Sequence, residues 1–211
     1  MINTHQLYLA RRFKPWQIIL VFGILQVFIY GIGSFTLDYF AGGATKSFGI
    51  WPEVDGVGFF FLYVLSFFIT LVTVLPILMI KRFGVGLAVY LPYAISGLFV
   101  EYYIEWSTLH TLASPWGVVG WCVIGLAIGF SADLAYRFLP GRINERWRAI
   151  ITGVLMGMVN FLLVLIALTF FYVERQSGTG TFLGVAYYGL PLLIINSGFG
   201  GYTAYAIFKN V

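Results

Sequence analysis

Residues 56–104 read GVGFFFLYVLSFFITLVTVLPILMIKRFGVGLAVYLPYAISGLFVEYYI, two apolar stretches interrupted by the basic pair Lys81–Arg82. A hydrocarbon core of about 30 Å is crossed by about 20 helical residues, and each stretch is long enough. Only Phe83 separates the basic pair from the second stretch, which begins near Gly84, so the two helices are expected to form a tight hairpin. This segment therefore predicts a helical membrane protein.

The composition of the whole chain agrees with this segment. Of its 211 residues, 60% are hydrophobic and 9% are charged, whereas a soluble domain carries about 25% charged residues. A water-soluble fold of this size is excluded, because it could not bury so much apolar surface. We expect an all-α polytopic protein of the cell membrane, with one six-helix transmembrane domain over residues 1–211. Its spans are expected at about residues 15–35, 56–80, 84–104, 115–139, 148–173 and 181–208.

The charged residues divide between the two sides of such a protein. With six spans, ten of the twelve Lys and Arg residues fall on one side, which the positive-inside rule identifies as cytoplasmic. They are Arg11, Arg12, Lys14, Lys81, Arg82, Arg137, Arg142, Arg146, Arg148 and Lys209. Both termini are therefore expected in the cytoplasm. Six of the eight acids fall on the outer side, namely Asp38, Glu53, Asp55, Glu101, Glu105 and Glu174.

The motifs of several function classes are missing from the sequence. There is no phosphate-binding glycine motif, no His-Glu-x-x-His, and no set of residues for a catalytic triad with only two histidines. The single cysteine, Cys122, excludes an internal disulfide and is expected to be a small buried residue. We therefore expect no enzyme, no cofactor and no metal. The basic residues lie at helix ends, where topology explains them, so nucleic acid is not expected as a partner.

The outer end of the third span carries the strongest candidate site. Glu101 and Glu105 are four residues apart and share one helix face, with Tyr102, Tyr103 and Trp106 around them. Carboxylates beside aromatic rings attract an organic cation through charge and through the ring faces. The alternative is an aromatic interfacial belt with solvated acids at a helix end.

Two further residues complete the candidate substrate-binding set. Trp51 belongs to the outer loop 36–55, which is expected either to fold as a lid over the outer mouth or to lie on the lipid headgroups. Asn196 is a polar group in the apolar sixth span, and it is expected either to bond a neighbouring helix or to reach a ligand.

The inner halves of the fourth and fifth spans show signs of close packing. Gly125 and Gly129, and again Gly153 and Gly157, have the Gly-x3-Gly spacing that lets helices approach closely in lipid. Asp133 lies inside the fourth span. It is expected to form an ion pair with Arg137 one turn away, or with a basic residue of the next loop.

The stretch from Lys81 to about Val164 resembles one family. Its motifs are KRFGVGLAVYLPYA (Lys81–Ala94), FVEYYIEW (Phe99–Trp106), SPWG (Ser114–Gly117) and GLAIGFSADLAYRF (Gly125–Phe138), followed by a short basic loop. This layout is similar to the substrate-binding S-component of an energy-coupling factor vitamin transporter, in its thiamine-related branch. The resemblance implies a substrate bound from outside, with scaffold and ATPase subunits as partners and no ATPase within this chain. It also implies that Glu101, Glu105, Tyr102 and Trp106 line the pocket.

Two functions are therefore expected from the sequence. The first is a substrate-binding membrane subunit of a transporter, which captures a small organic cation or vitamin-like solute at the outer face. The second is a non-catalytic structural subunit of a larger membrane complex, because glycine tracks and abundant aromatic residues also suit packing against other membrane subunits. Membrane lipid is an expected partner in either case.

Overall fold

Six helices make up the part of the chain that the computed structural model describes, residues 13–37, 56–100, 115–171 and 179–210. They are α2 (Pro15–Leu37), α3 (Gly56–Ile80), α4 (Val85–Val100), α5 (Pro115–Phe138), α6 (Glu145–Phe171) and α7 (Thr179–Asn210). No strand occurs within these residues. The all-α fold and the six expected helices are confirmed, and the loop expected at 36–55 lies mostly outside the described residues.

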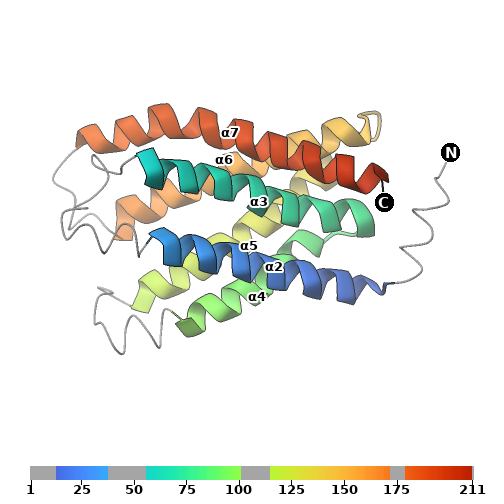
Figure 1. Ribbon diagram of the computed structural model, residues 1–211, viewed down its shortest axis with the longest axis horizontal. Coiled ribbons are helices and arrows are strands. Elements are labelled where there is room, and N and C mark those ends of the chain that lie inside the picture. The colour runs from blue at the N-terminus through green and yellow to red at the C-terminus, as the bar shows by residue number, and fades with distance from the viewer. Residues whose placement is uncertain (1–12, 38–55, 101–114, 172–178, 211) are drawn as a thin grey trace.

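The helices run along the long axis of the molecule, as Figure 1 shows. At one end α2 begins, α3 turns into α4, α5 turns into α6, and α7 ends. We call this the basic end and define it as residues 13–15, 80–85, 137–148 and 208–210. All the Lys and Arg residues of the described segments lie there, and these are Lys14, Lys81, Arg82, Arg137, Arg142, Arg146, Arg148 and Lys209.

Local capping decides where the helices start at the basic end. Asn144 caps α6, because its side-chain oxygen accepts a hydrogen bond from the Arg146 amide at 3.0 Å. This cap explains why α6 begins at Glu145, three residues before the start expected at Arg148. At the start of α2, the Lys14 amide donates to Oε1 of Gln17 at 2.8 Å, and Pro15 occupies the first helical position, where no backbone bond is lost.

The centre of the bundle is α3, which packs against each of the other five helices. Its side chains Val74 and Leu78 are fully buried, and Ile77 is 1% exposed. Small polar groups are buried there too. Thr73 is satisfied because its hydroxyl donates to the Ile69 carbonyl at 2.8 Å. A helix that is apolar on all faces is expected to be the most enclosed helix of a bundle.

Glycines set how closely several helix pairs approach. A Cβ on Gly129 of α5 would lie 2.6 Å from the Gly86 carbonyl oxygen of α4, and one on Gly86 would lie 2.5 Å from that of Gly129. Gly153 and Gly157 of α6 make the same kind of contact with Ser197 of α7. The packing role predicted for the two Gly-x3-Gly pairs is confirmed.

A glycine of α2 also permits a close contact with another helix. A Cβ on Gly23 of α2 would lie 2.7 Å from the ring of Pro92 in α4. A proline inside a helix disturbs the turn around it. Gly23 leaves room for the Pro92 ring because it has no side chain. The parallel pair α2 and α4 is brought together at this point.

One stretch among the described side chains, Glu145–Leu163, is long and apolar enough to cross a membrane by length and composition. The described parts of α2, α3 and α4 contribute shorter apolar stretches, Pro15–Ile29, Leu65–Ile80 and Val85–Ser96. A single helix of this kind also occurs in the cores of soluble proteins.

The contact between Gly86 and Gly129 yields a first prediction. Gly129→Ala is expected to destabilise the protein by about 1–3 kcal/mol, because the new methyl group meets a backbone carbonyl that cannot move aside. Gly141→Ala is the matched control, since nothing lies within 4 Å of a Cβ at that position. Thermal unfolding in detergent, followed by circular dichroism, measures both. Equal melting temperatures for the two variants would contradict the close approach of α4 and α5.

Candidate functional site

The residues predicted to bind a substrate are described only in part. Trp51, Glu101, Tyr102, Glu105 and Trp106 lie outside the described residues, so their assignment stays a prediction. Asn196 is described, and it lies partly buried near the middle of α7. Its neighbour Ser197 is the residue that packs on Gly153 and Gly157, so this part of α7 belongs to the contact with α6.

The best-defined polar interaction in the described residues involves Asp133 of α5. This side chain is 2% exposed. Its Oδ1 accepts a hydrogen bond from the Gly86 amide at 2.9 Å, and its Oδ2 accepts one from the Leu87 amide at 3.0 Å. The expected ion pair of Asp133 with Arg137 or with a loop residue is therefore wrong, because the carboxylate binds the N-terminus of α4.

The reason lies in the turn between α3 and α4. The first amides of a helix have no partner within the helix, and a side chain just before the helix ordinarily accepts from them. Gly84 precedes α4, has φ of 91°, and offers no side chain. Asp133 provides the missing acceptors from a different helix. The N-terminal end of a helix dipole also favours a negative charge.

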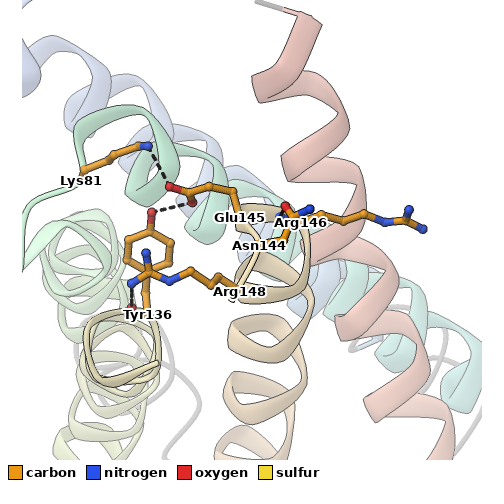
Figure 2. A network of polar contacts seen from close by, with 6 residues as sticks. All are labelled: Lys81, Tyr136, Asn144, Glu145, Arg146 and Arg148. Carbon is orange, nitrogen blue, oxygen red and sulfur yellow. Dashed lines mark hydrogen bonds and ion pairs between the residues drawn. The ribbon is translucent and has the colours of Figure 1, made fainter. Parts of the chain in front are cut away.

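The same turn carries a second unusual residue. Lys81, which follows α3, has φ of 54°, a left-handed conformation that costs a residue with a side chain about 1–2 kcal/mol. Its amide still donates to the Ile77 carbonyl at 2.8 Å and so completes the end of α3. The conformation directs the Lys81 side chain toward the second turn of the basic end (Figure 2).

Lys81 belongs to a network that joins the two turns, shown in Figure 2. Its Nζ lies 2.9 Å from Oε1 of Glu145, the first residue of α6. The Tyr136 hydroxyl of α5 donates to the other oxygen, Oε2, at 2.9 Å. Arg148 covers the Tyr136 ring, with Cζ 4.5 Å from the ring centroid, and its Nη2 donates to the Tyr136 carbonyl at 2.8 Å.

The electrostatics of this network favour a charged carboxylate. Glu145 lies at the polar start of α6, and its side chain is 34% exposed. Burial alone would raise the pKa of this carboxyl, but hydrogen bonds from Lys81 and Tyr136 and the charges of Lys81 and Arg148 lower its pKa below the ordinary value. Because both ionic partners are partly exposed, the pair contributes about 1 kcal/mol or less.

Arg146 is placed differently from the rest. Figure 2 shows its side chain extending away from the Glu145 carboxylate toward α7. Its Cζ lies 5.0 Å from the ring centroid of Tyr202 and 5.9 Å from that of Trp147. Among the residues that the structure describes, Arg146 forms no ion pair.

The arrangement is suited to holding helices together rather than to chemistry. Both carboxylates are engaged by donors, and no nucleophile with an adjacent base is formed by the residues of Figure 2. This network was not predicted from the sequence, because its residues come from three separate segments of the chain. A signal was present in that Glu145 is the one acid of the short basic loop 140–148.

Cys122 was expected to be buried, and this is confirmed at 7% exposed. Its Sγ lies 3.0 Å from the Ala94 carbonyl oxygen of α4. Two residues of α5 thus contact α4: Asp133 at the first turn of α4, and Cys122 further along it at Ala94.

The cap of α4 gives a second prediction. Asp133→Ala leaves one buried and one partly buried amide without an acceptor, so the free energy of unfolding is expected to fall by about 2–4 kcal/mol. Asp133→Asn keeps one acceptor oxygen and is expected to lose roughly half as much. Ser131→Ala on the same helix is the control, because Ser131 bonds only the nearby Ile128 carbonyl. Unfolding in detergent tests the series, and an Asp133→Ala variant as stable as Ser131→Ala would refute the cap.

No protein-family model, no curated protein and no solved structure matches this chain.

Proposed function

We propose that this chain is a six-span membrane subunit of a transporter, with its basic end in the cytoplasm, that captures a small organic cation or vitamin-like solute at the opposite, outer face. It carries no ATPase and works with scaffold and ATPase subunits. The vitamin-transporter S-component that residues 81–164 resemble has this division of labour.

The observation that carries the proposal is the apolar outer surface of the bundle. Large hydrophobic side chains are exposed on all six helices, including Phe28 of α2 at 61%, Val123 of α5 at 58% and Ile195 of α7 at 63%. The helix α2 contains no charged residue at all. Large apolar side chains exposed on every helix are unfavourable in water and are covered in functional proteins by lipid or by other chains.

The distribution of charge supports the orientation. Every Lys and Arg of the described segments lies at the basic end, beside the two tight turns. Cytoplasmic loops of membrane proteins carry an excess of these residues. The basic end is therefore assigned to the cytoplasm.

The capture of a cation rests on the sequence of the outer end of α4. Glu101 and Glu105 come directly after Val100, where α4 ends, and lie outside the described residues. Their spacing of four residues predicts a shared face if this segment is helical, as the sequence predicts. An ionisable residue near a span, among aromatic residues, is a site for a ligand of opposite charge. Asp133 and Glu145, the acids of the described residues near the basic end, are both engaged by donors, which supports a ligand that binds at the other side.

A structural subunit of a larger membrane complex is the second candidate, and one observation favours it. The exposed residues of α2 form a broad apolar face that lacks any polar anchor, and they are Leu20, Val21, Ile24, Leu25 and Phe28. Another membrane subunit could cover this face as well as lipid does.

Native mass spectrometry of the gently solubilised protein, followed by titration with thiamine as a representative cation, distinguishes the two candidates. The transporter subunit is expected to bind the cation. Glu101→Gln is expected to weaken binding about tenfold or more, because the hydrogen bond and attraction of a charged acceptor are lost. Glu174→Gln, an outer acid on another loop, is the matched control and is expected to bind normally.

Three outcomes decide the matter. Loss of binding in Glu101→Gln alone supports the outer site. Equal binding by Glu101→Gln and the unaltered protein would exclude Glu101 from the pocket. A stoichiometric membrane partner other than ATPase and scaffold subunits, with no bound small molecule, would favour the structural subunit.

A further inference from the structure

A narrow stripe of exposed side chains runs along α7 toward the basic end. It consists of Leu192, Ile195, Phe199 and Tyr202, which are all exposed. Their spacing of three, four and three residues places them on one helix face. The helix rises about 15 Å between Leu192 and Tyr202, which is half of a hydrocarbon core of about 30 Å. The stripe therefore has the length of one leaflet.

Aromatic contacts give the end of the stripe nearest the basic end a defined shape. The rings of Phe199 and Tyr202 are stacked with their centroids 6.3 Å apart. Phe67 of α3 lies against Phe199 at 5.5 Å, and the exposed Phe68 meets Phe67 edge-on at 5.1 Å. Such ring pairs add about 0.5–1.5 kcal/mol beyond the area they bury, which favours this arrangement of the surface.

At the end of the stripe nearest the basic end lies a cation, Arg146, that forms no ion pair with the acids of the described segments. The Arg146 guanidinium lies over the Tyr202 ring, and Figure 2 shows it directed toward α7. Lys81, by contrast, is paired with Glu145, and Arg148 is turned onto Tyr136. Arg146 therefore places a guanidinium, unpaired by Asp133 or Glu145, beside an apolar surface on the same side of the bundle.

The geometry points to a binding site for one anionic phospholipid of the cytoplasmic leaflet, with its phosphate at Arg146 and an acyl chain along Tyr202, Phe199 and Ile195. Guanidinium groups bind phosphate through paired hydrogen bonds, and aromatic stacking leaves the donor edges of Arg146 available. An apolar partner helix would cover the stripe but would not neutralise the charge of Arg146. The site rests on the proposed membrane insertion and adds to it a preference for acidic headgroups.

The test is native mass spectrometry of the detergent-solubilised full chain, titrated with phosphatidylglycerol or with phosphatidylcholine of the same acyl chains. We expect tighter binding of phosphatidylglycerol. Arg146→Gln should weaken that binding about fivefold, which corresponds to one basic residue acting at a membrane surface. Arg142→Gln, which alters an exposed basic residue of the turn just before α6, should change it less than twofold. Phe199→Ala should weaken the binding of both lipids.

The outcomes separate this site from the membrane proposal. Three results would overturn the lipid site: equal affinity for the two lipids, equal losses in Arg146→Gln and Arg142→Gln, or displacement of lipid by free glycerol phosphate. The proposed membrane insertion would stand in each case if the protein still needs detergent to stay in solution. A second protein chain that dissociates in Phe199→Ala would assign the stripe to a protein partner and would equally overturn it. A chain that stays soluble without detergent and binds neither lipid would overturn both proposals.

Discussion

The carboxylate of Asp133 fixes the arrangement on which the rest of the basic end depends. It takes up the free amides of Gly86 and Leu87 at 2.9 and 3.0 Å, because Gly84 has no side chain to cap α4. The bonds require α5 to lie against the first turn of α4, and Gly129, one turn before Asp133, makes that approach sterically possible. A buried carboxylate is unfavourable unless donors surround it, and the start of a helix supplies two of them at once. The position of each helix therefore depends on the other.

This contact leaves the two turns of the basic end side by side, where the charged residues take different roles. Lys81 and Tyr136 meet on the Glu145 carboxylate, and this connects the α3–α4 turn with the start of α6. Arg146, which follows Glu145 in the chain, is directed outward to Tyr202 and forms no ion pair with an acid of the described residues. The basic residues of this end are thus not equivalent, since Lys81 pairs with Glu145 and ties two turns together, whereas Arg146 pairs with no acid of the described residues.

Much of the fold follows from the sequence, because apolar length and basic turns determine helices without knowledge of their neighbours. The glycine pairs also packed as their spacing predicted. The partner of Asp133 did not follow, because spacing along α5 suggests Arg137 and says nothing of the uncapped start of α4 at Val85, whose Leu87 amide lies 46 residues before Asp133. The missing cap at Gly84 was the available signal. The contact of Arg146 with Tyr202 likewise joins distant segments, and the site predicted at Glu101 and Glu105 lies beyond the described end of α4.

The central claim is that the basic end is the cytoplasmic end of a bundle that crosses the membrane. Cysteine accessibility tests it most directly, in a Cys122→Ser background that removes the one native thiol. Lys46→Cys and Arg142→Cys would be treated with a membrane-impermeant maleimide in intact cells and again after permeabilisation. The account predicts that Lys46→Cys is labelled in intact cells and that Arg142→Cys is labelled only after permeabilisation. Labelling of Arg142→Cys in intact cells, or the same accessibility for both positions, would contradict it.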